Sequence, residues 1–192
     1  MESNRWKFAL ATTIGILPLV FLISHNSSPM IQAEKDVPEQ TLILSGKEDP
    51  ISLRSVLEGK QSFVYFGSLE SRTEGKENLK KFLSWMGKID RKNAQFVFIT
   101  LVPEKDDYNS LKEKLGSISE RVLLLKPKNS SSAFELARSF GIQAYIVPEL
   151  GNLKFDEALI WVDDSPKIRG IFPKFAENPD SIRIPEFLVQ AK

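Results

Sequence analysis

Two uninterrupted apolar runs constrain the fold of this chain most. Residues 62–66 read SFVYF and residues 94–101 read AQFVFITL. Runs rich in β-branched and aromatic residues are typical of strands that are buried on both faces of a sheet. Between them lies a stretch, residues 74–89, whose apolar side chains recur at helical spacing: Leu79, Phe82, Leu83, Met86 and Ile89. Strand, helix and strand in this order predict a parallel β-α-β unit.

The alternation continues toward the C-terminus. Residues 122–125 predict a strand, and a helix follows, capped by Ser131 or Ser132 and stopped by Gly141. A further helix is expected at residues 108–115, a loop at 148–157, and a terminal helix at 184–191. Residues 158–163 and 168–172 flank a polar turn and predict a closing hairpin. This order predicts a thioredoxin-like α/β sandwich with a parallel-centred sheet.

The N-terminal segment has the composition of a membrane helix. Arg5 and Lys7 precede residues 8–24, which carry no charge. We expect a single-pass anchor helix within residues 1–25, a linker at 26–40 and the thioredoxin-like domain at 41–192. A cleaved signal peptide is the alternative. Basic residues stay on the cytoplasmic side, so the domain is expected outside the inner membrane, in the periplasm or an intermembrane space.

Composition excludes several kinds of chemistry. The 26 basic residues nearly balance the 25 acidic ones, and no basic tract suggests nucleic-acid binding. The chain has no cysteine, and His25 is its only histidine. Thiol and disulfide chemistry, Cys/His zinc sites, iron–sulfur clusters and Ser-His-Asp triads are therefore excluded. We expect no cofactor.

Four segments, in this order, resemble the Sco/SenC family of membrane-anchored, thioredoxin-like proteins that support assembly of the copper centre of cytochrome c oxidase. Residues 59–67 are similar to the first core strand of that family and its terminal Tyr-Phe-Gly. Residues 98–115 resemble its Pro-Glu loop, 136–142 its helix end, and 158–172 its closing hairpin. The similarity covers roughly residues 41–175.

The resemblance implies a copper site that this chain has lost. The family binds copper through Cys-x-x-x-Cys after Tyr-Phe-Gly and through a distant histidine. These positions fall on Ser71, Gly75 and Asp156. Copper(I) prefers sulfur ligands, which serine, glycine and aspartate do not supply. The resemblance therefore implies ancestry and a cellular process rather than copper binding.

Two other kinds of activity stay open at this point. Ser71 with Lys76 or Arg72 is a conceivable nucleophile and base in a cysteine-free enzyme. Paired carboxylates are conceivable ligands for Ca²⁺ or Mg²⁺: Asp106-Asp107, Asp156-Glu157 and Asp163-Asp164. None of the pairs has the alternate-residue spacing of a calcium loop. As turn and cap residues they need no metal.

The leading interpretation is a noncatalytic, membrane-anchored Sco-like protein that binds a protein partner, such as subunits of a respiratory complex. It either assists assembly of a cytochrome c oxidase-like complex or is an accessory component of it. The expected contact lies where the ligands of the family converge, at Ser68, Leu69, Glu70, Ser71 and Asp156. Phe155 and Trp161 belong either to an exposed apolar surface nearby or to the core.

Overall fold

Strands β4 (Gln61–Gly67) and β5 (Ala94–Thr100) run parallel at the centre of the sheet. Both are buried almost throughout, as their apolar runs predicted. Because alternate side chains of a strand point to opposite faces, Val64 enters one core and its neighbour Tyr65 enters the other. The two buried strands therefore separate two hydrophobic cores.

The computed structural model describes residues 30–44, 46–69, 73–87, 89, 94–106, 109, 113, 122–149, 151–173, 175, 177, 179 and 182. Within these residues, eight strands form one mixed sheet in the order β1-β10-β9-β4-β5-β6-β2-β3, and β7 pairs only with β8. The remaining elements are β1 (Ile31–Asp36), β2 (Thr41–Leu44), β3 (Pro50–Ser52), α2 (Leu53–Leu57), α3 (Thr73–Met86), β6 (Val122–Lys126), α5 (Ser130–Ser139), β7 (Ala144–Val147), β8 (Asn152–Phe155), β9 (Leu159–Val162) and β10 (Lys167–Phe172).

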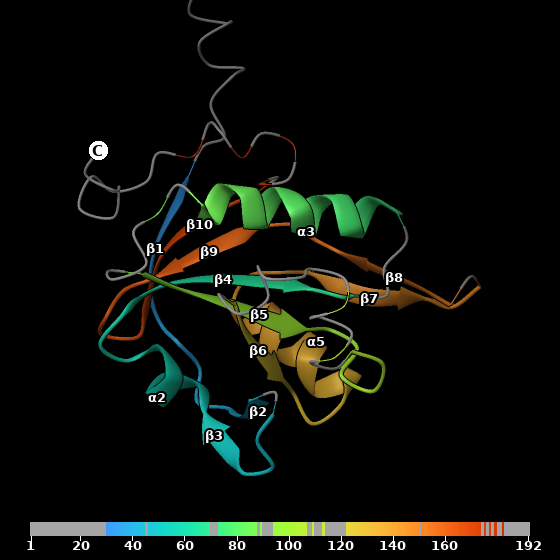
Figure 1. Cartoon of the computed structure of the whole chain (residues 1–192), viewed down its shortest axis with the longest axis horizontal. Coiled ribbons are helices and arrows are strands. Elements are labelled where there is room, and N and C mark those ends of the chain that lie inside the picture. Colours follow the sequence, from blue (N-terminus) through green and yellow to red (C-terminus); the bar gives the residue numbers. More distant parts are fainter. Residues whose placement is uncertain are drawn as a thin grey trace, which may run out of the picture.

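Helices cover both faces of the sheet, as the alternating pattern predicted. Figure 1 shows α3 on one face and α5 on the other. The apolar stripe of α3 is core, and its Trp85 meets the Phe63 ring edge-on at 4.9 Å between centroids. The α5 residues Leu136 and Ala137 belong to the opposite core. The predicted closing hairpin is confirmed by antiparallel β9 and β10.

Strand β1 corrects the expectation of a linker through residues 26–40, because it joins the main sheet beside β10. Most of its side chains are exposed, so an edge strand of this kind has no apolar periodicity to detect. Side-chain contacts add to the backbone pairing of β1 with β10. A Cβ at Gly170 would lie 2.6 Å from the Met30 sulfur, so the glycine makes room for that side chain. Residues 31–36 are part of the sheet rather than a tether.

Two local expectations differ from the structure. The cap of α5 is Asn129, whose Oδ1 accepts the Ser132 amide at 2.9 Å, rather than Ser131 or Ser132. The loop expected at 148–157 contains strand β8, which pairs with β7 through a turn with Gly151 at φ +61°. Short strands with polar residues resemble loops in composition. The glycine stop of α5 is confirmed, with Gly141 at φ +83°.

Several expected elements lie outside the described residues. These are the anchor at residues 8–24, the terminal helix at 184–191, and residues 108–115 except for 109 and 113. Among the described residues, no helix has the length and apolar character needed to cross a membrane.

Candidate functional site

One edge of the sheet brings together three loops that are distant in the sequence. Parallel β4 and β5 end side by side, with Gly67 opposite Thr100. Antiparallel β9 begins at the same edge, because Leu159 lies opposite Tyr65. The segments after β4, after β5 and before β9 therefore leave the sheet at one place. The carboxyl ends of central parallel strands are where α/β proteins most often form binding sites.

Buried polar contacts connect the first two of these loops. The Asp106 Oδ2 atom accepts the Leu69 amide at 2.8 Å and the Thr100 hydroxyl at 2.7 Å. The Thr100 oxygen in turn accepts the Val102 amide at 3.0 Å. Asp106 and Thr100 are both 0% exposed. A carboxylate with no access to water therefore fixes the start of the loop that follows β4.

The loop after β5 is also fixed to α5. Glu104 accepts the Ser130 amide at 2.9 Å through Oε1 and the Ser130 hydroxyl at 2.6 Å through Oε2. The Ser130 hydroxyl, the Ser130 amide and nearby Lys126 lower the pKa of Glu104, although slight burial opposes them. A negative charge at a helix N-terminus also interacts favourably with the helix dipole.

The third loop carries Asp156, the position at which the family resemblance expects a histidine ligand. Its Oδ2 atom accepts the Gln143 amide at 2.9 Å, and its own amide donates to the Gln143 carbonyl at 2.9 Å. These two bonds join Asp156 to the base of the β7–β8 hairpin, and because Asp156 is exposed it also faces solvent.

Burial raises the pKa of the Tyr65 hydroxyl, and the negative charge of neighbouring Glu157 raises it further. Tyr65 therefore stays protonated.

The predicted contact residues differ in how much surface they offer. Ser68 is 7% exposed and Leu69 is 1% exposed, so these side chains support the edge from within and present almost no contact surface. Glu70 and Ser71 lie outside the described residues, as does Arg72. Gly75 and Lys76 lie in α3, where only their backbone is described. The prediction of a partner contact at Glu70, Ser71 and Asp156 stays a prediction.

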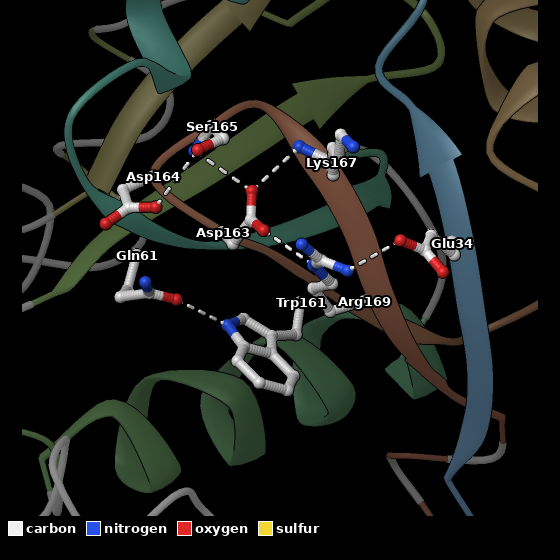
Figure 2. A network of polar contacts seen from close by, with 8 residues as sticks. All are labelled: Glu34, Gln61, Trp161, Asp163, Asp164, Ser165, Lys167 and Arg169. Atoms are coloured by element: carbon white, nitrogen blue, oxygen red, sulfur yellow. Dashed lines mark hydrogen bonds and ion pairs between the residues drawn. The ribbon is translucent and has the colours of Figure 1, made fainter.

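Of the carboxylate pairs, Asp163-Asp164 is held within a turn by hydrogen bonds of the protein itself. The Asp163 Oδ1 atom accepts the Ser165 and Lys167 amides, each at 3.0 Å, and Oδ2 accepts Arg169 Nε at 2.6 Å (Figure 2). Arg169 also reaches Glu34 of β1 at 3.3 Å. This network lies at the β9–β10 turn, at the opposite end of β9 from the candidate site. In the described part of the chain, no three acidic or histidine side chains are grouped as metal ligands.

Phe155 and Trp161, which were expected either on an exposed apolar surface or in the core, are packed within the fold. Trp161 is half-buried, and its indole Nε1 donates to the Gln61 side chain at 2.8 Å (Figure 2). Phe155 is half-buried and packs against the core on the α5 side. Neither residue forms an exposed apolar patch.

Two large apolar side chains that are exposed lie instead on β7. Tyr145 is 54% exposed and Ile146 is 45% exposed. Because neighbouring residues of a strand point to opposite faces, the hairpin meets solvent on both faces. Figure 1 shows it extending beyond the C-terminal end of β4, away from the main sheet. The composition of residues 144–147 alone does not distinguish an exposed strand from a buried one.

Comparison with solved structures places this arrangement in the class of thioredoxin-like α/β proteins. Apo Sco1 from Thermus thermophilus superposes with a TM-score of 0.61 at 19% identity, over 80% of this chain and 91% of that chain. BsSco, described as a member of the Sco family of cytochrome c oxidase assembly proteins, gives 0.62 at 16% identity, over 76% and 86%. Copper-bound yeast Sco1 gives 0.58 at 17% identity, over 76% and 84%.

The family follows from the sequence itself. The SCO1/SenC family model matches residues 43–183, and the chain belongs to this family. No curated protein sequence matches the chain. The resemblance on which the sequence analysis relied is thus confirmed, together with the thioredoxin-like fold.

The residues of this chain do not fit the copper that its relative yeast Sco1 holds. The whole sequence contains no cysteine, and His25 lies before the first described residue. At Asp156, where the resemblance implies the third ligand, one oxygen already accepts the Gln143 amide. Oxygen donors of this kind favour hard cations over copper(I). The chain therefore has the fold of its family without the sulfur donors that copper(I) prefers.

Proposed function

We propose that this chain acts through protein contacts in the assembly of a respiratory complex of the cytochrome c oxidase type, or as an accessory part of that complex. In this proposal it is noncatalytic and has no copper site of its own. The observation that carries the proposal is the retention of the family sheet edge in a chain that lacks cysteine. BsSco, which has the same fold, belongs to a family of cytochrome c oxidase assembly proteins.

A position at the membrane surface is part of the proposal. The uncharged run at residues 8–24 supports a single-pass anchor, and the basic residues before it support a domain outside the inner membrane. Strand β1 begins at Ile31, so the intervening residues span at most about 20 Å. A domain held this closely meets partners whose contact surface is near the membrane.

The exposed part of the candidate edge is the proposed contact surface. It comprises Asp156 and the β7–β8 hairpin, where Tyr145, Ile146 and Lys154 are exposed. Apolar and aromatic side chains next to a few charges are typical of the centre of protein interfaces.

The test is affinity capture of the tagged full chain from mildly crosslinked native membranes, with mass spectrometry of the recovered proteins. We expect respiratory subunits in a fixed ratio to the chain. Ile146→Asp and Asp156→Arg should each lower recovery several-fold while the melting temperature changes little. Ile43→Asp is the matched control, because Ile43 is 38% exposed on β2. Equal recovery from all variants would refute the proposed surface, and an empty wild-type capture would refute the function.

A further inference from the structure

We infer that Thr100 and Asp106 are a positioning pair that fixes Ser68 and Leu69, the first two residues after β4, in one conformation. The inference rests on the chain of hydrogen bonds from the Val102 amide to Thr100, from Thr100 to Asp106, and from the Leu69 amide to the same Asp106 oxygen. Both side chains of the pair, Thr100 and Asp106, are buried. The pair therefore connects the ends of two central strands through the interior of the protein.

The geometry leaves the Thr100 hydroxyl a single productive orientation. Its oxygen accepts the Val102 amide at 3.0 Å, so its proton is directed to Asp106 at 2.7 Å. In addition, a backbone hydrogen bond from the Leu101 amide to the Gly67 carbonyl at 2.8 Å extends the parallel pairing of β4 and β5 to their ends. Removing a member of such a buried network leaves the remaining polar atoms without their partners, which favours local opening.

Gly67 shows that this corner is tightly packed. A Cβ at Gly67 would lie 3.1 Å from the Phe98 ring and 3.2 Å from the Tyr65 ring. The chain therefore turns from β4 into the loop over two aromatic side chains, with little room to shift. The buried acceptor at Asp106 meets the first amide beyond Ser68. Packing from one side and a hydrogen bond from the other determine the direction in which the loop leaves the sheet.

A fixed start of the segment after β4 has a functional consequence, which rests on the proposed function. A contact surface that is ordered before binding avoids part of the entropic cost of ordering at the interface. In a chain without copper ligands, this order has to come from the protein. The Thr100–Asp106 pair supplies it at the edge where Asp156 and the β7–β8 hairpin emerge.

The direct test is hydrogen exchange of the full chain, resolved by overlapping peptides that end on either side of Leu69. Thr100→Val removes the hydroxyl with little change of shape, and Asp106→Ala removes the acceptor. Both should accelerate exchange of the Leu69 amide by about tenfold or more. Thr100→Ser keeps the hydroxyl and should exchange like the wild type. The Gly59 amide, which donates to the Asp164 carbonyl at 2.9 Å, is the control for global unfolding.

Capture from native membranes then tests the contact. Thr100→Val should lower recovery of the partner while Thr100→Ser restores it. Unchanged Leu69 exchange in Thr100→Val would overturn the positioning role, and faster exchange with unchanged capture would overturn its use in binding. An empty wild-type capture would instead refute the proposed function, and Leu69 exchange would still decide whether the pair positions the loop. If Asp106→Ala does not fold, the two Thr100 variants complete the test.

Discussion

At the scale of single residues, Asp163 shows how one carboxylate organises a turn and an edge strand. It accepts two backbone amides of its own turn and the Arg169 side chain, which also contacts Glu34 of β1 (Figure 2). Burial disfavours the charged form of Asp163, but these hydrogen bonds outweigh burial and lower its pKa. The carboxylate is therefore ionised in the folded protein at a pH where an unfolded chain already begins to bind protons.

This shift predicts a pH-dependent loss of stability. An unfolded aspartate has a pKa of about 3.9, and the folded value for Asp163 is lower. The network therefore stabilises the fold above about pH 4 and fades as the pH falls through the folded pKa. Asp163→Asn should cost about 2 kcal/mol at pH 7. Melting temperatures from pH 7 to pH 3 should show the gap narrowing below pH 4, and a constant gap would contradict this assignment.

At the scale of elements, α5 depends on the residue that precedes it. Asn129 caps the helix by accepting the Ser132 amide, and it also accepts the Ser132 hydroxyl at 2.8 Å. The Gly141 stop closes the other end, where the Ile142 amide donates to the Ala137 carbonyl at 2.9 Å. A helix with both ends satisfied presents a fixed N-terminus to Glu104 and hence to the candidate edge.

The cap predicts different losses of stability for two alanine substitutions. Asn129→Ala should lower the free energy of unfolding by about 1 kcal/mol, because it leaves the Ser132 amide without its side-chain acceptor. Ser131→Ala should have almost no effect, since Ser131 is exposed and alanine has a high helix propensity. Denaturant unfolding of both variants measures the difference. A larger loss for Ser131→Ala would show that the cap lies two residues later, at Ser131.

The elements that sequence patterns predicted are those with a clear periodicity. The buried strands β4 and β5, the apolar stripe of α3 and the closing hairpin all have such a pattern. Strand β1 does not, because its side chains alternate between two exposed faces. The β7–β8 hairpin does not either, since its exposed Tyr145 resembles a core residue in composition. Period-based prediction needs a continuous alternation of apolar and polar residues, which these short elements lack.

The candidate site could be predicted in position but only partly in its residues. Asp156 was expected at the edge and lies there, but its bond to Gln143 depends on the β7–β8 hairpin, which was not predicted. Thr100 and Asp106 were missed as a pair. A threonine at the end of a buried strand, followed six residues later by an aspartate, is a weak signal. Only the pairing of β4 with β5 brings the Leu69 amide to that aspartate.

At the scale of the whole molecule, the chain keeps the fold of its family in a sequence without cysteine. The SCO1/SenC match spans residues 43–183, and the sheet, both helical layers and the closing hairpin are present. Strand β1 extends the sheet toward the N-terminal segment, where Met30 packs into the space at Gly170. A scaffold retained without cysteine supports the proposal that the chain acts through surface contacts.

The measurement that tests this account most directly is capture of the tagged full chain from native membranes, with and without a strong copper(I) chelator. The account predicts that respiratory subunits are recovered in the same fixed ratio under both conditions, because the contact uses protein surface alone. An empty capture, or recovery that disappears when copper is removed, would contradict it.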